Sequence, residues 1–334
     1  MASSIQEIAE ILGVSITTVS RSLNDRPGIN QETRARVKSL AQKLNYRPNH
    51  IAQSLASGKT NTLGVLTGDL QEPHYAELAQ RIEESAEQRG FNVILAPIIA
   101  GRDFDSKLTN LRSRGVDGII VTAAYSEEQL SGLWQLLVDK VPVVVGANTE
   151  HFSTDYVRVN GVEATRVAVK HLIDLGHKKI AYLSLSKTIT AHHRFNGFQS
   201  AMQEAGIPIK DELLIKCLGY RFEAYQHMKE ILQLQDRPTA IYAHNDLAAI
   251  GAMRAIREAG LSVPYDISII SYGNTEDCEY QAVKLTAIDY PRAELAGHLT
   301  DLMQKRISMP ESPVQQVVLE SNLVMRESVA PPRE

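Results

Sequence analysis

Residues 4–24 read Ser4-Ile-Gln-Glu-Ile-Ala-Glu-Ile-Leu-Gly-Val-Ser-Ile-Thr-Thr-Val-Ser-Arg-Ser-Leu-Asn24, and this stretch predicts two short helices joined by a tight turn. Ser4 is expected to cap the first helix, and Glu7 completes a capping box three residues later. Apolar side chains then recur at helical spacing as far as Leu12, so one face of this helix is predicted to be buried. Gly13 permits the chain to reverse.

The second of these helices is expected to present a largely polar face to its surroundings. It is predicted to run from Ile16 to about Leu23, with Ser15 as its cap and Val19 packed against the first helix. The side chains that then point outward are Ile16, Thr17, Ser20 and Arg21. In a helix-turn-helix pair, such positions meet the major groove of DNA.

Positive charge is concentrated at this end of the chain. The 334-residue sequence has a formal net charge of −4, yet residues 1–60 hold eight Lys or Arg against four Asp or Glu, a net of +4. The remaining residues therefore carry a net charge of −8. A capped helical pair alone occurs in many folds, but a small basic module on an acidic remainder indicates a partner rich in phosphate.

A third helix is predicted to complete a three-helix head, with Asn30 as its cap. Its apolar positions are Val37, Leu40, Ala41 and Leu44. Pro48 is expected to end this helix, because the residue before a proline is pushed out of the helical region. The nine residues 49–57 that follow are too few to remain helical alone in water. This segment is therefore predicted to fold only when it finds a partner.

Several separated motifs occur in the order found in one bacterial family. They are Ile8-Ala-Glu-Ile-Leu-Gly-Val-Ser15, Thr18-Val-Ser-Arg21, Asn45-Tyr-Arg-Pro-Asn49, Ala52-Gln-Ser-Leu-Ala-Ser-Gly58, Gly64-Val-Leu66, Arg194-Phe-Asn-Gly-Phe198, Ala243-His-Asn-Asp246 and Pro264-Tyr-Asp-Ile-Ser268. With these motifs the chain resembles the lactose-repressor (LacI/GalR) family of transcription regulators along essentially its whole length. The resemblance implies a homodimer on double-stranded operator DNA, with recognition helices in successive major grooves and paired hinge helices in the minor groove between them.

The resemblance also implies which residues contact the operator. They are Ser4, Ile16, Thr17, Thr18, Ser20, Arg21, Asn24, Asn49, Ala52, Gln53, Leu55 and Ala56. Leu55 would be the wedge inserted between base steps at the centre of a palindrome. Arg21 can make a bidentate contact to guanine, worth about 1–3 kcal/mol of discrimination, or it can contact a phosphate and carry no sequence information.

From Thr62 onward, apolar runs alternate with amphipathic helices, which predicts parallel sheets covered on both faces. The first series of strands is expected at Leu63 to Leu66, Val93 to Ile98, Gly118 to Thr122 and Val141 to Val145, with helices from about Tyr75, Asp103 and Glu127. The second series is expected at Lys179 to Leu185, Leu213 to Leu218, Thr239 to Ala243 and Ile267 to Tyr272. Two series predict two lobes, and a late helix from Tyr290 to near Ile307 would return the chain to the first lobe.

The expected fold is therefore a small all-α helix-turn-helix head joined by a hinge helix to a two-lobed α/β core with parallel sheets. The resemblance implies that this core has the type I periplasmic-binding-protein architecture. The head is placed at 1–47, the hinge helix and linker at 48–60, and the effector-binding and dimerisation core at 61–334. The first lobe is expected at about 61–160 plus 291–320, and the second at about 161–290 plus 321–330.

The chain is expected to cross between the lobes three times, near Val159 to Gly161, Asp289 to Pro291 and Glu320 to Asn322. Ligands of open α/β sheets bind beyond the carboxyl ends of the strands, so the cleft between the lobes is the expected pocket. Closure of two lobes over a ligand is one way in which binding changes the geometry of a dimer.

A small-molecule effector related to carbohydrates is expected in that cleft. The resemblance places Arg194 and Asn245 at effector-contacting positions. The further candidates lie on the surrounding loops: His74, Tyr75, Asn148, Thr190, His192, Tyr220, Gly273 and Asn274. Arg194 can bind vicinal hydroxyls or a carboxylate, or it can form a structural ion pair. Surface or packing roles are equally open for the loop residues.

The chain lacks an acid at three places where sugar-binding relatives commonly carry one. These places are Gly146, Val159 and Gly273. Neither glycine nor valine can accept two hydroxyls of a pyranose, so a simple neutral monosaccharide is not expected. A phosphorylated sugar, an acidic metabolite, a larger glycoside held by aromatic residues such as Tyr75 and Tyr220, or no small ligand at all remain open. With no acid expected near Arg194, an anionic effector is our hypothesis.

An enzyme is not expected, and neither a catalytic residue, a metal nor a cofactor is assigned. Gly58-Lys-Thr60 resembles the end of a phosphate-binding loop, but that motif needs a glycine at position 53, which is Gln53. The adjacent His192 and His193 diverge on a helix, and neither a HExxH motif nor a Gly-x-Ser-x-Gly elbow is present.

A secreted solute-binding protein would share the two lobes but not the head. Residues 1–13 contain Glu7 and Glu10 and have no long apolar run, so no export signal is expected. We find no membrane-spanning stretch, and the cysteines Cys217 and Cys278 suit a reducing cytoplasm. We therefore expect a cytoplasmic bacterial protein, associated with the nucleoid when it is bound.

The final residues contain no leucine heptad, so a dimer is expected rather than a tetramer. The interface is expected to include the first-lobe helix from about Tyr75 to Arg89 and faces of both lobes. The sequence leaves open whether the effector is an inducer or a corepressor, and which operator and genes are involved. A ligand-independent or protein-coregulated transcription factor with a vestigial pocket is the alternative function.

Overall fold

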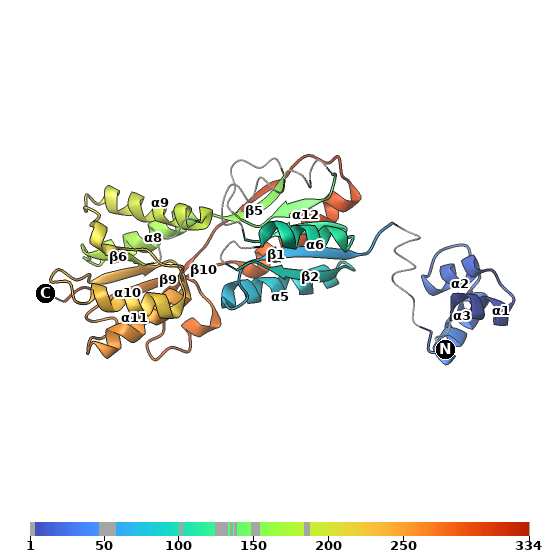
Figure 1. Ribbon diagram of the computed structural model, residues 1–334, viewed down its shortest axis with the longest axis horizontal. Coiled ribbons are helices and arrows are strands. Elements are labelled where there is room, and N and C mark those ends of the chain that lie inside the picture. Colours follow the sequence, from blue (N-terminus) through green and yellow to red (C-terminus); the bar gives the residue numbers. More distant parts are fainter. Residues whose placement is uncertain are drawn as a thin grey trace. The chain divides into compact units, whose positions relative to one another are not determined.

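The computed structural model describes residues 4–46, 58–99, 103–123, 133, 136, 139–147, 154–183 and 188–333. The chain divides into two compact units, Met1–Thr60 and Asn61–Glu334. The described residues of the first unit form helices, whereas the second unit combines sheets and helices (Figure 1).

The head is built from α1 (Ile5–Leu12), α2 (Ile16–Leu23) and α3 (Gln31–Lys43). Its core consists of the buried side chains of Ile8, Ala9, Val19, Val37 and Ala41. Each helix contributes to this core, so none of the three buries its apolar face without the other two.

The predicted helix caps are confirmed. Ser4 Oγ accepts from the backbone N–H of Glu7, and the Glu7 carboxylate accepts in return from the Ser4 N–H. Ser15 and Asn30 cap α2 and α3 with their side-chain oxygens, which accept from the backbone N–H groups of Thr18 and Thr33. Gly13 closes α1 in the left-handed conformation, at φ 65°. These bonds satisfy backbone donors that a helix leaves unpaired at its start.

Helix α3 ends earlier than Pro48 predicts. It ends at Lys43, and Asn45 then adopts the left-handed conformation at φ 49°. The N–H of Tyr46 donates back to the carbonyl of Ala41 at 2.9 Å. A left-handed residue with such a returning bond is a helix stop in its own right, so the helix does not need the proline to end it.

The first lobe holds a parallel sheet in the order β11-β5-β4-β3-β1-β2. Its strands are β1 (Thr62–Thr67), β2 (Asn92–Pro97), β3 (Gly118–Val121), β4 (Val143–Val145), β5 (Asp155–Val159) and β11 (Gln316–Leu319). Helices α5 (Pro73–Glu87) and α12 (Arg292–Ser308) share a hydrophobic cluster on one face of the sheet, and α6 (Phe104–Ser113) packs into the cluster on the other face.

The second lobe holds a similar sheet in the order β12-β10-β9-β8-β6-β7, in which only β12 is antiparallel among the described strands. Its strands are β6 (Ile180–Leu183), β7 (Leu214–Ile215), β8 (Ala240–Ala243), β9 (Ser268–Gly273), β10 (Thr286–Asp289) and β12 (Leu323–Val324). Figure 1 shows α8 (Gly161–Asp174) and α9 (Ile189–Glu204) on one side of this sheet, with α10 (Arg221–Ile231) and α11 (Asp246–Glu258) on the other.

The chain passes between the two sheets after β5, after β10 and after β11. Helix α12 lies on the first lobe, which confirms that the late helix returns there. The predicted strands are found, but β4 and β7 are shorter than expected, and β5, β10, β11 and β12 were not predicted as strands. Strand β5 was missed because its sequence contains Asp155 and Arg158. Asp155 is buried, and its carboxylate pairs with Arg306 Nε at 2.7 Å.

Glycines permit the closest helix contacts in the second lobe. A Cβ atom on Gly197 would lie 2.2 Å from the Val162 carbonyl, and one on Gly251 would lie 2.2 Å from the Arg221 carbonyl. The Gly197 contact lets α9 lie directly against α8, which fixes the face of α9 that points toward the first lobe.

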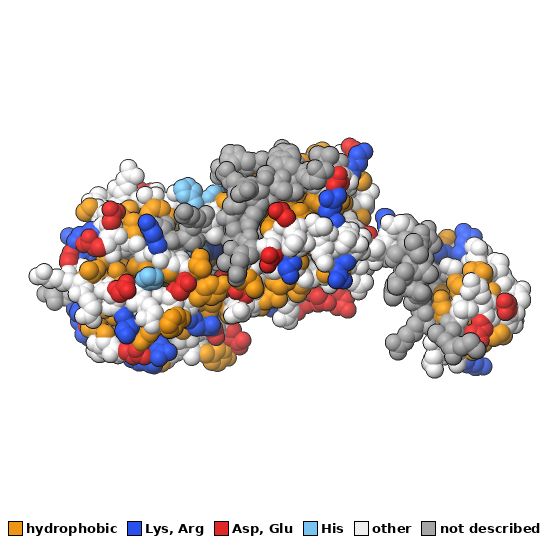
Figure 2. All heavy atoms as spheres, in the orientation of Figure 1, with side chains coloured by type: hydrophobic (Ala, Val, Ile, Leu, Met, Phe, Trp, Pro, Cys, Tyr) orange, Lys and Arg blue, Asp and Glu red, His pale blue; other side chains and the backbone are white. Residues whose placement is uncertain are grey.

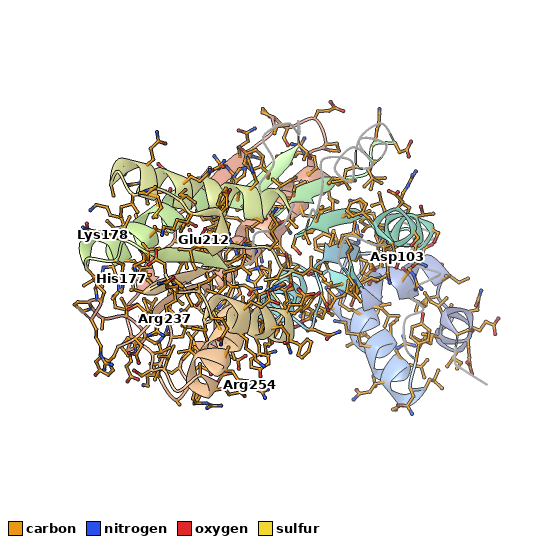
Figure 3. The ribbon with its side chains drawn as sticks, turned by 60° about the vertical axis from the view of Figure 1, so that its left-hand side comes forward. Asp103, His177, Lys178, Glu212, Arg237 and Arg254 are labelled. Atoms are coloured by element: carbon orange, nitrogen blue, oxygen red, sulfur yellow. The ribbon has the colours of Figure 1, made fainter. Side chains whose placement is uncertain are left out.

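The end of the second lobe remote from the first lobe carries charged side chains of both signs, since Lys179 and Lys210 both pair with Asp236. His177, Lys178 and Arg237 lie together at this end (Figure 3). His177 bonds Thr239 Oγ1 and the Ala330 carbonyl, both at 2.9 Å, and burial lowers its pKa. These contacts hold the last described residues against the sheet, on the side opposite to the carboxyl ends of its parallel strands.

Candidate functional site

The outward face of α2 presents a small group of exposed side chains. Ile16 is 47% exposed, and Thr17 and Arg21 are also exposed. Thr18 and Ser20 are half-buried, and Thr18 Oγ1 lies 2.9 Å from Ser15 Oγ. Ile16, Thr17 and Arg21 are therefore the residues of this helix that are open to a partner.

Two other predicted contacts in the head also support its helices. Ser4 caps α1, and the side chain of Asn24 donates to the Ser20 carbonyl at 2.9 Å. Both residues lie at helix ends and have a structural role there, whether or not they also contact DNA. Asn49, Ala52, Gln53, Leu55 and Ala56 lie outside the described residues.

The basic side chains of the head fall into two groups. Lys38 donates to both carboxylate oxygens of Asp25, at 2.7 and 2.8 Å, and Arg34 lies 3.8 Å from the same carboxylate. These pairs hold the loop after α2 against α3. Arg21 and Arg36 are exposed and form no ion pair with the described residues, so their charges are available to a polyanion.

In the second unit, the two lobes enclose a cavity of ≈ 280 Å³. The cavity is lined by residues from both lobes, at the ends of the parallel strands. Seven predicted effector residues line it: His74, Tyr75, Thr190, Arg194, Tyr220, Asn245 and Gly273. Such a position and size are typical of small-molecule sites in open α/β folds.

Three other predicted effector residues are not among those lining the cavity. His192 is exposed on α9, because its neighbour Arg194 occupies the inward direction of that helix. The Asn274 side chain is engaged elsewhere, donating to Asp289 at 2.9 Å and accepting from Arg326 at 2.7 Å. Asn148 lies outside the described residues.

Arg194 lines the cavity and is 7% exposed. Its Nη1 donates to the His244 carbonyl at 2.5 Å, and its guanidinium carbon lies 3.6 Å from the centroid of the Tyr272 ring. Among the described residues, neither Arg194 Nε nor the buried His244 Nδ1 has a hydrogen-bond partner. An unpaired buried N–H carries a desolvation cost that a ligand can recover.

An acid that the sequence analysis missed faces this arginine. Glu72 lines the cavity from the first lobe, and its carboxylate accepts a hydrogen bond from the side chain of Asn245 and is attracted by Arg194. The expectation that no acid lies near Arg194 is therefore wrong. Glu72 precedes Pro73 at the start of α5, so its place in the sequence marks only the beginning of a helix and gives no sign of a partner in the other lobe.

Burial governs the charge state of the cavity's ionisable groups. Burial raises the pKa of the Glu72 carboxyl to about 7, and the Asp69 carboxylate adds to the rise, while Arg194 and Asn245 oppose it. Burial also lowers the pKa of His74 to about 3 with help from Arg292 and Arg194, and burial together with Arg194 lowers the pKa of His244 well below its ordinary value. Both imidazoles are therefore neutral near pH 7, and Glu72 is close to half-ionised.

Aromatic rings form much of the cavity wall. Tyr75, Tyr220, Tyr272 and Tyr290 line it together with the His74 ring, whose centroid lies 4.5 Å from that of Tyr290. A Cβ atom on Gly68 would lie 2.3 Å from the Tyr75 ring, so glycine is needed there for the ring to lie against the backbone. Rings of this kind offer flat apolar faces to a ligand.

The lobes also touch directly beside the cavity. Tyr220 of the second lobe donates to Asp69 of the first at 2.8 Å. Arg292 at the start of α12 donates to the carbonyls of Gly273 and Asn274, at 2.6 and 2.9 Å, and pairs with Glu77 of α5 at 2.8 Å. These contacts join the lobes at two places, so a ligand that changes the lobe angle must also act on them.

The three positions that the sequence analysis singled out for lacking an acid lie around the cavity. Gly146, Val159 and Gly273 all line the cavity. Gly273 has φ 144°, and a Cβ atom there would lie 2.5 Å from Asp246 Oδ2. Asp246 is buried and accepts from Ser271 and Thr275, so a second carboxylate could not enter at position 273 without displacing it.

In the described part of the chain, no group of three His, Cys, Asp or Glu side chains is arranged to hold a metal ion. No helix in this part of the chain has the length and apolar character needed to cross a membrane.

We predict that Glu72→Gln changes stability in a pH-dependent way. The pKa of Glu72 is about 7 in the folded protein against an ordinary value of 4.5, so the unfolded chain loses this proton first as pH rises, and the wild type loses stability over that interval. Glutamine cannot ionise. The variant should therefore gain up to about 3 kcal/mol over wild type at about pH 8 and little at about pH 5, as measured by urea unfolding.

The matched control is Glu83→Gln, which removes the same charge from the exposed face of the same helix. A stability difference for Glu72→Gln that is the same at both pH values would show that burial does not perturb this carboxyl.

Comparisons with known proteins agree with both units. Residues 4–49 match the family described as bacterial regulatory proteins, lacI family, and residues 169–329 match a periplasmic binding protein-like domain. A lac repressor dimer bound to operator and the anti-inducer ONPF has a TM-score of 0.91 at 26% identity, covering 99% of this chain and 100% of that one.

Two further relatives have higher sequence identity. A LacI family regulator from Enterococcus faecium with bound ribose has a TM-score of 0.72 at 33% identity, covering 81% of this chain and 99% of that one. The HTH-type transcriptional repressor PurR of Mannheimia succiniciproducens is 32% identical over 327 residues, which is 97% of this chain and 98% of the relative. These relatives are regulators and not enzymes. The chain belongs to the lacI family of bacterial regulatory proteins, and it is a DNA-binding transcriptional repressor.

Proposed function

We propose that this repressor binds a palindromic operator as a homodimer, and that a carbohydrate-related effector in the interlobe cleft sets its affinity for that operator. The proposal of an effector rests on the cleft, which is lined by residues of both lobes. The cleft contains buried polar atoms that have no hydrogen-bond partner among the described residues. A ligand bound there contacts both lobes at once. It can therefore favour one lobe angle over another.

The alternative of a vestigial pocket is disfavoured by the same atoms. Arg194 Nε and His244 Nδ1 are buried without a partner among the described residues, which is costly in a protein that binds nothing there. The family comparison includes a regulator with bound ribose, which supports the class of effector.

Operator reading is assigned to the exposed face of α2. Ile16 offers apolar contact, for instance to a thymine methyl, and Thr17 can donate or accept. Arg21, which is exposed on the same face, can address guanine through two parallel bonds. The segment 48–60 is proposed to fold on the DNA with its copy in the second protomer, with Leu55 as the wedge. A regulator that binds operator DNA is proposed to act in the bacterial cytoplasm.

An exposed apolar patch supports a dimer whose interface involves both lobes. Leu70 follows Asp69 in the first lobe, and Leu218 and Phe222 flank Tyr220 in the second. The Tyr220–Asp69 hydrogen bond brings these segments together, and the three side chains are 37%, 54% and 70% exposed. Figure 2 shows hydrophobic side chains gathered near the junction of the lobes. Exposed apolar surface of this kind favours a protein interface, here beside the cavity that Leu218 also lines.

We predict that Arg21→Ala relaxes discrimination at one base pair in each half-site. Loss of a bidentate contact should cost about 1–3 kcal/mol on the selected operator and much less on operators altered at that pair. Selection of bound fragments from random DNA, followed by titration at fixed salt, measures this. Arg36→Ala, on the exposed face of α3, serves as the control for simple loss of charge. If Arg21→Ala weakens binding equally on all DNA sequences, Arg21 contacts a phosphate and does not read a base.

We predict that Phe222→Asp shifts the protein toward monomer, because it puts a charge in the centre of an apolar interface. Analytical ultracentrifugation should show at least a tenfold higher dissociation constant, which corresponds to about 1.4 kcal/mol. Val167→Asp, at a 42% exposed position on α8, is the control and should remain dimeric. An unchanged dimer in the Phe222 variant would exclude this patch from the interface.

A further inference from the structure

Glu72 occupies the N-cap position of α5 but does not cap it. Its backbone conformation is that of an N-cap, and Pro73 follows at the first helical position, yet the structure shows no hydrogen bond from its side chain to the helix start. Glutamate is not among the favoured N-cap residues, and its carboxylate is directed into the cavity instead. Its role therefore lies in the cleft rather than in the helix.

The second lobe meets this carboxylate with two donors. Asn245 uses its side-chain oxygen to accept from the Ala248 N–H at 2.8 Å, where it caps α11, and this leaves its amide group to donate to Glu72. Arg194 contributes a positive charge nearby, with Nε unpaired among the described residues. An acceptor on one lobe thus faces donors on the other.

We propose that Glu72 is a specificity-determining residue of the cleft, whose carboxylate accepts hydroxyl hydrogens from a neutral polyol while other oxygens of that polyol accept from Arg194. This inference rests on the proposed function and names the chemistry of its effector. It replaces the hypothesis of an anionic effector, which depended on the absence of an acid near Arg194.

The chemistry of the two walls separates the classes of ligand. A hydroxyl group both donates and accepts, so a polyol can satisfy Glu72 and Arg194 with the same functional group. A phosphate or carboxylate only accepts and would meet the like charges of Glu72 and Asp69. The three positions without an acid, Gly146, Val159 and Gly273, then leave Glu72 as the lining carboxylate among the described residues.

Binding of such a ligand is expected to release a proton. Hydrogen bonds from hydroxyls favour the charged form of Glu72, so the ligand should lower its pKa and bind more tightly as pH rises through 7. The charged and titratable groups around Glu72 include Arg194 from α9, Asp69 from the loop after β1, His74 from α5 and His244 from the end of β8. The phenols that also line the cavity are those of Tyr75, Tyr220, Tyr272 and Tyr290. Both imidazoles have lowered pKa values, so they remain neutral over this interval.

The test is calorimetry of the full-length dimer with matched neutral and anionic probes. The neutral probes are D-ribose, D-glucose and cellobiose, and their anionic counterparts are ribose 5-phosphate, glucose 6-phosphate and cellobionate. We expect a neutral probe to bind at least tenfold more tightly than its anionic counterpart. Glu72→Gln should weaken binding of the neutral probe about tenfold and reduce the difference in affinity between the neutral and anionic probes. Glu83→Gln should change neither the affinity nor this difference. Titration in two buffers of different ionisation enthalpy should show proton release by wild type and not by Glu72→Gln.

The proposal is overturned if an anionic probe binds more tightly than its neutral counterpart, if no neutral probe binds, or if Glu72→Gln leaves the neutral affinity unchanged. Operator titration in the presence of the bound probe separates this inference from the proposed function. A neutral probe that binds through Glu72 but leaves operator affinity unaltered would refute effector control alone.

Discussion

A guanidinium buried between two lobes is the constraint around which the second unit is arranged. Removing a charge from water costs several kcal/mol unless polar groups replace its solvation. Arg194 is 7% exposed, and it is compensated by the His244 carbonyl, by the Tyr272 ring and by Glu72 across the cavity. Because Nε stays unpaired among the described residues, the compensation is incomplete, and the cavity keeps a directional donor for a ligand.

Several neighbouring residues position the Arg194 guanidinium and the groups around it. Gly197 lets α9 approach α8 closely, which fixes the face of α9 that carries Arg194. Gly273 leaves room for Asp246, whose carboxylate ties the end of β9 to the start of α11. Glu72 faces the arginine from the opposite lobe because α5 begins at Pro73, which places the preceding residue, Glu72, in the cavity lining. The opposing charges therefore come from different lobes, and the attraction between them depends on the distance between the lobes.

Transmission to DNA is the part of the proposed function that depends on this arrangement. The lobes are joined by three chain crossings and by the contacts of Arg292 and Tyr220, so a change in their relative angle must break or rearrange these contacts. A ligand that alters the angle in both protomers would move the two copies of the segment 48–60 relative to each other. Coupling of this kind is typically about 1–3 kcal/mol.

Local features of the sequence predicted much of the fold, because caps and amphipathic faces are properties of adjacent residues. Ser4, Ser15 and Asn30 were placed correctly for this reason, as was the two-lobed α/β class. Short edge strands such as β12 were missed, since two residues carry no readable period. Glu72 was missed because its role depends on Asn245 and Arg194, which are far away in sequence and belong to the other lobe.

If the cleft controls the DNA-binding head, binding of a cleft ligand and binding of operator are thermodynamically coupled, and a reciprocal titration tests this coupling most directly. Operator affinity is measured with and without a saturating cleft ligand, and ligand affinity is measured with and without saturating operator, in the same buffer and salt. We predict that both affinities change by the same factor, between about 5-fold and 150-fold. If operator DNA leaves ligand affinity unchanged, the cleft does not control the DNA-binding head.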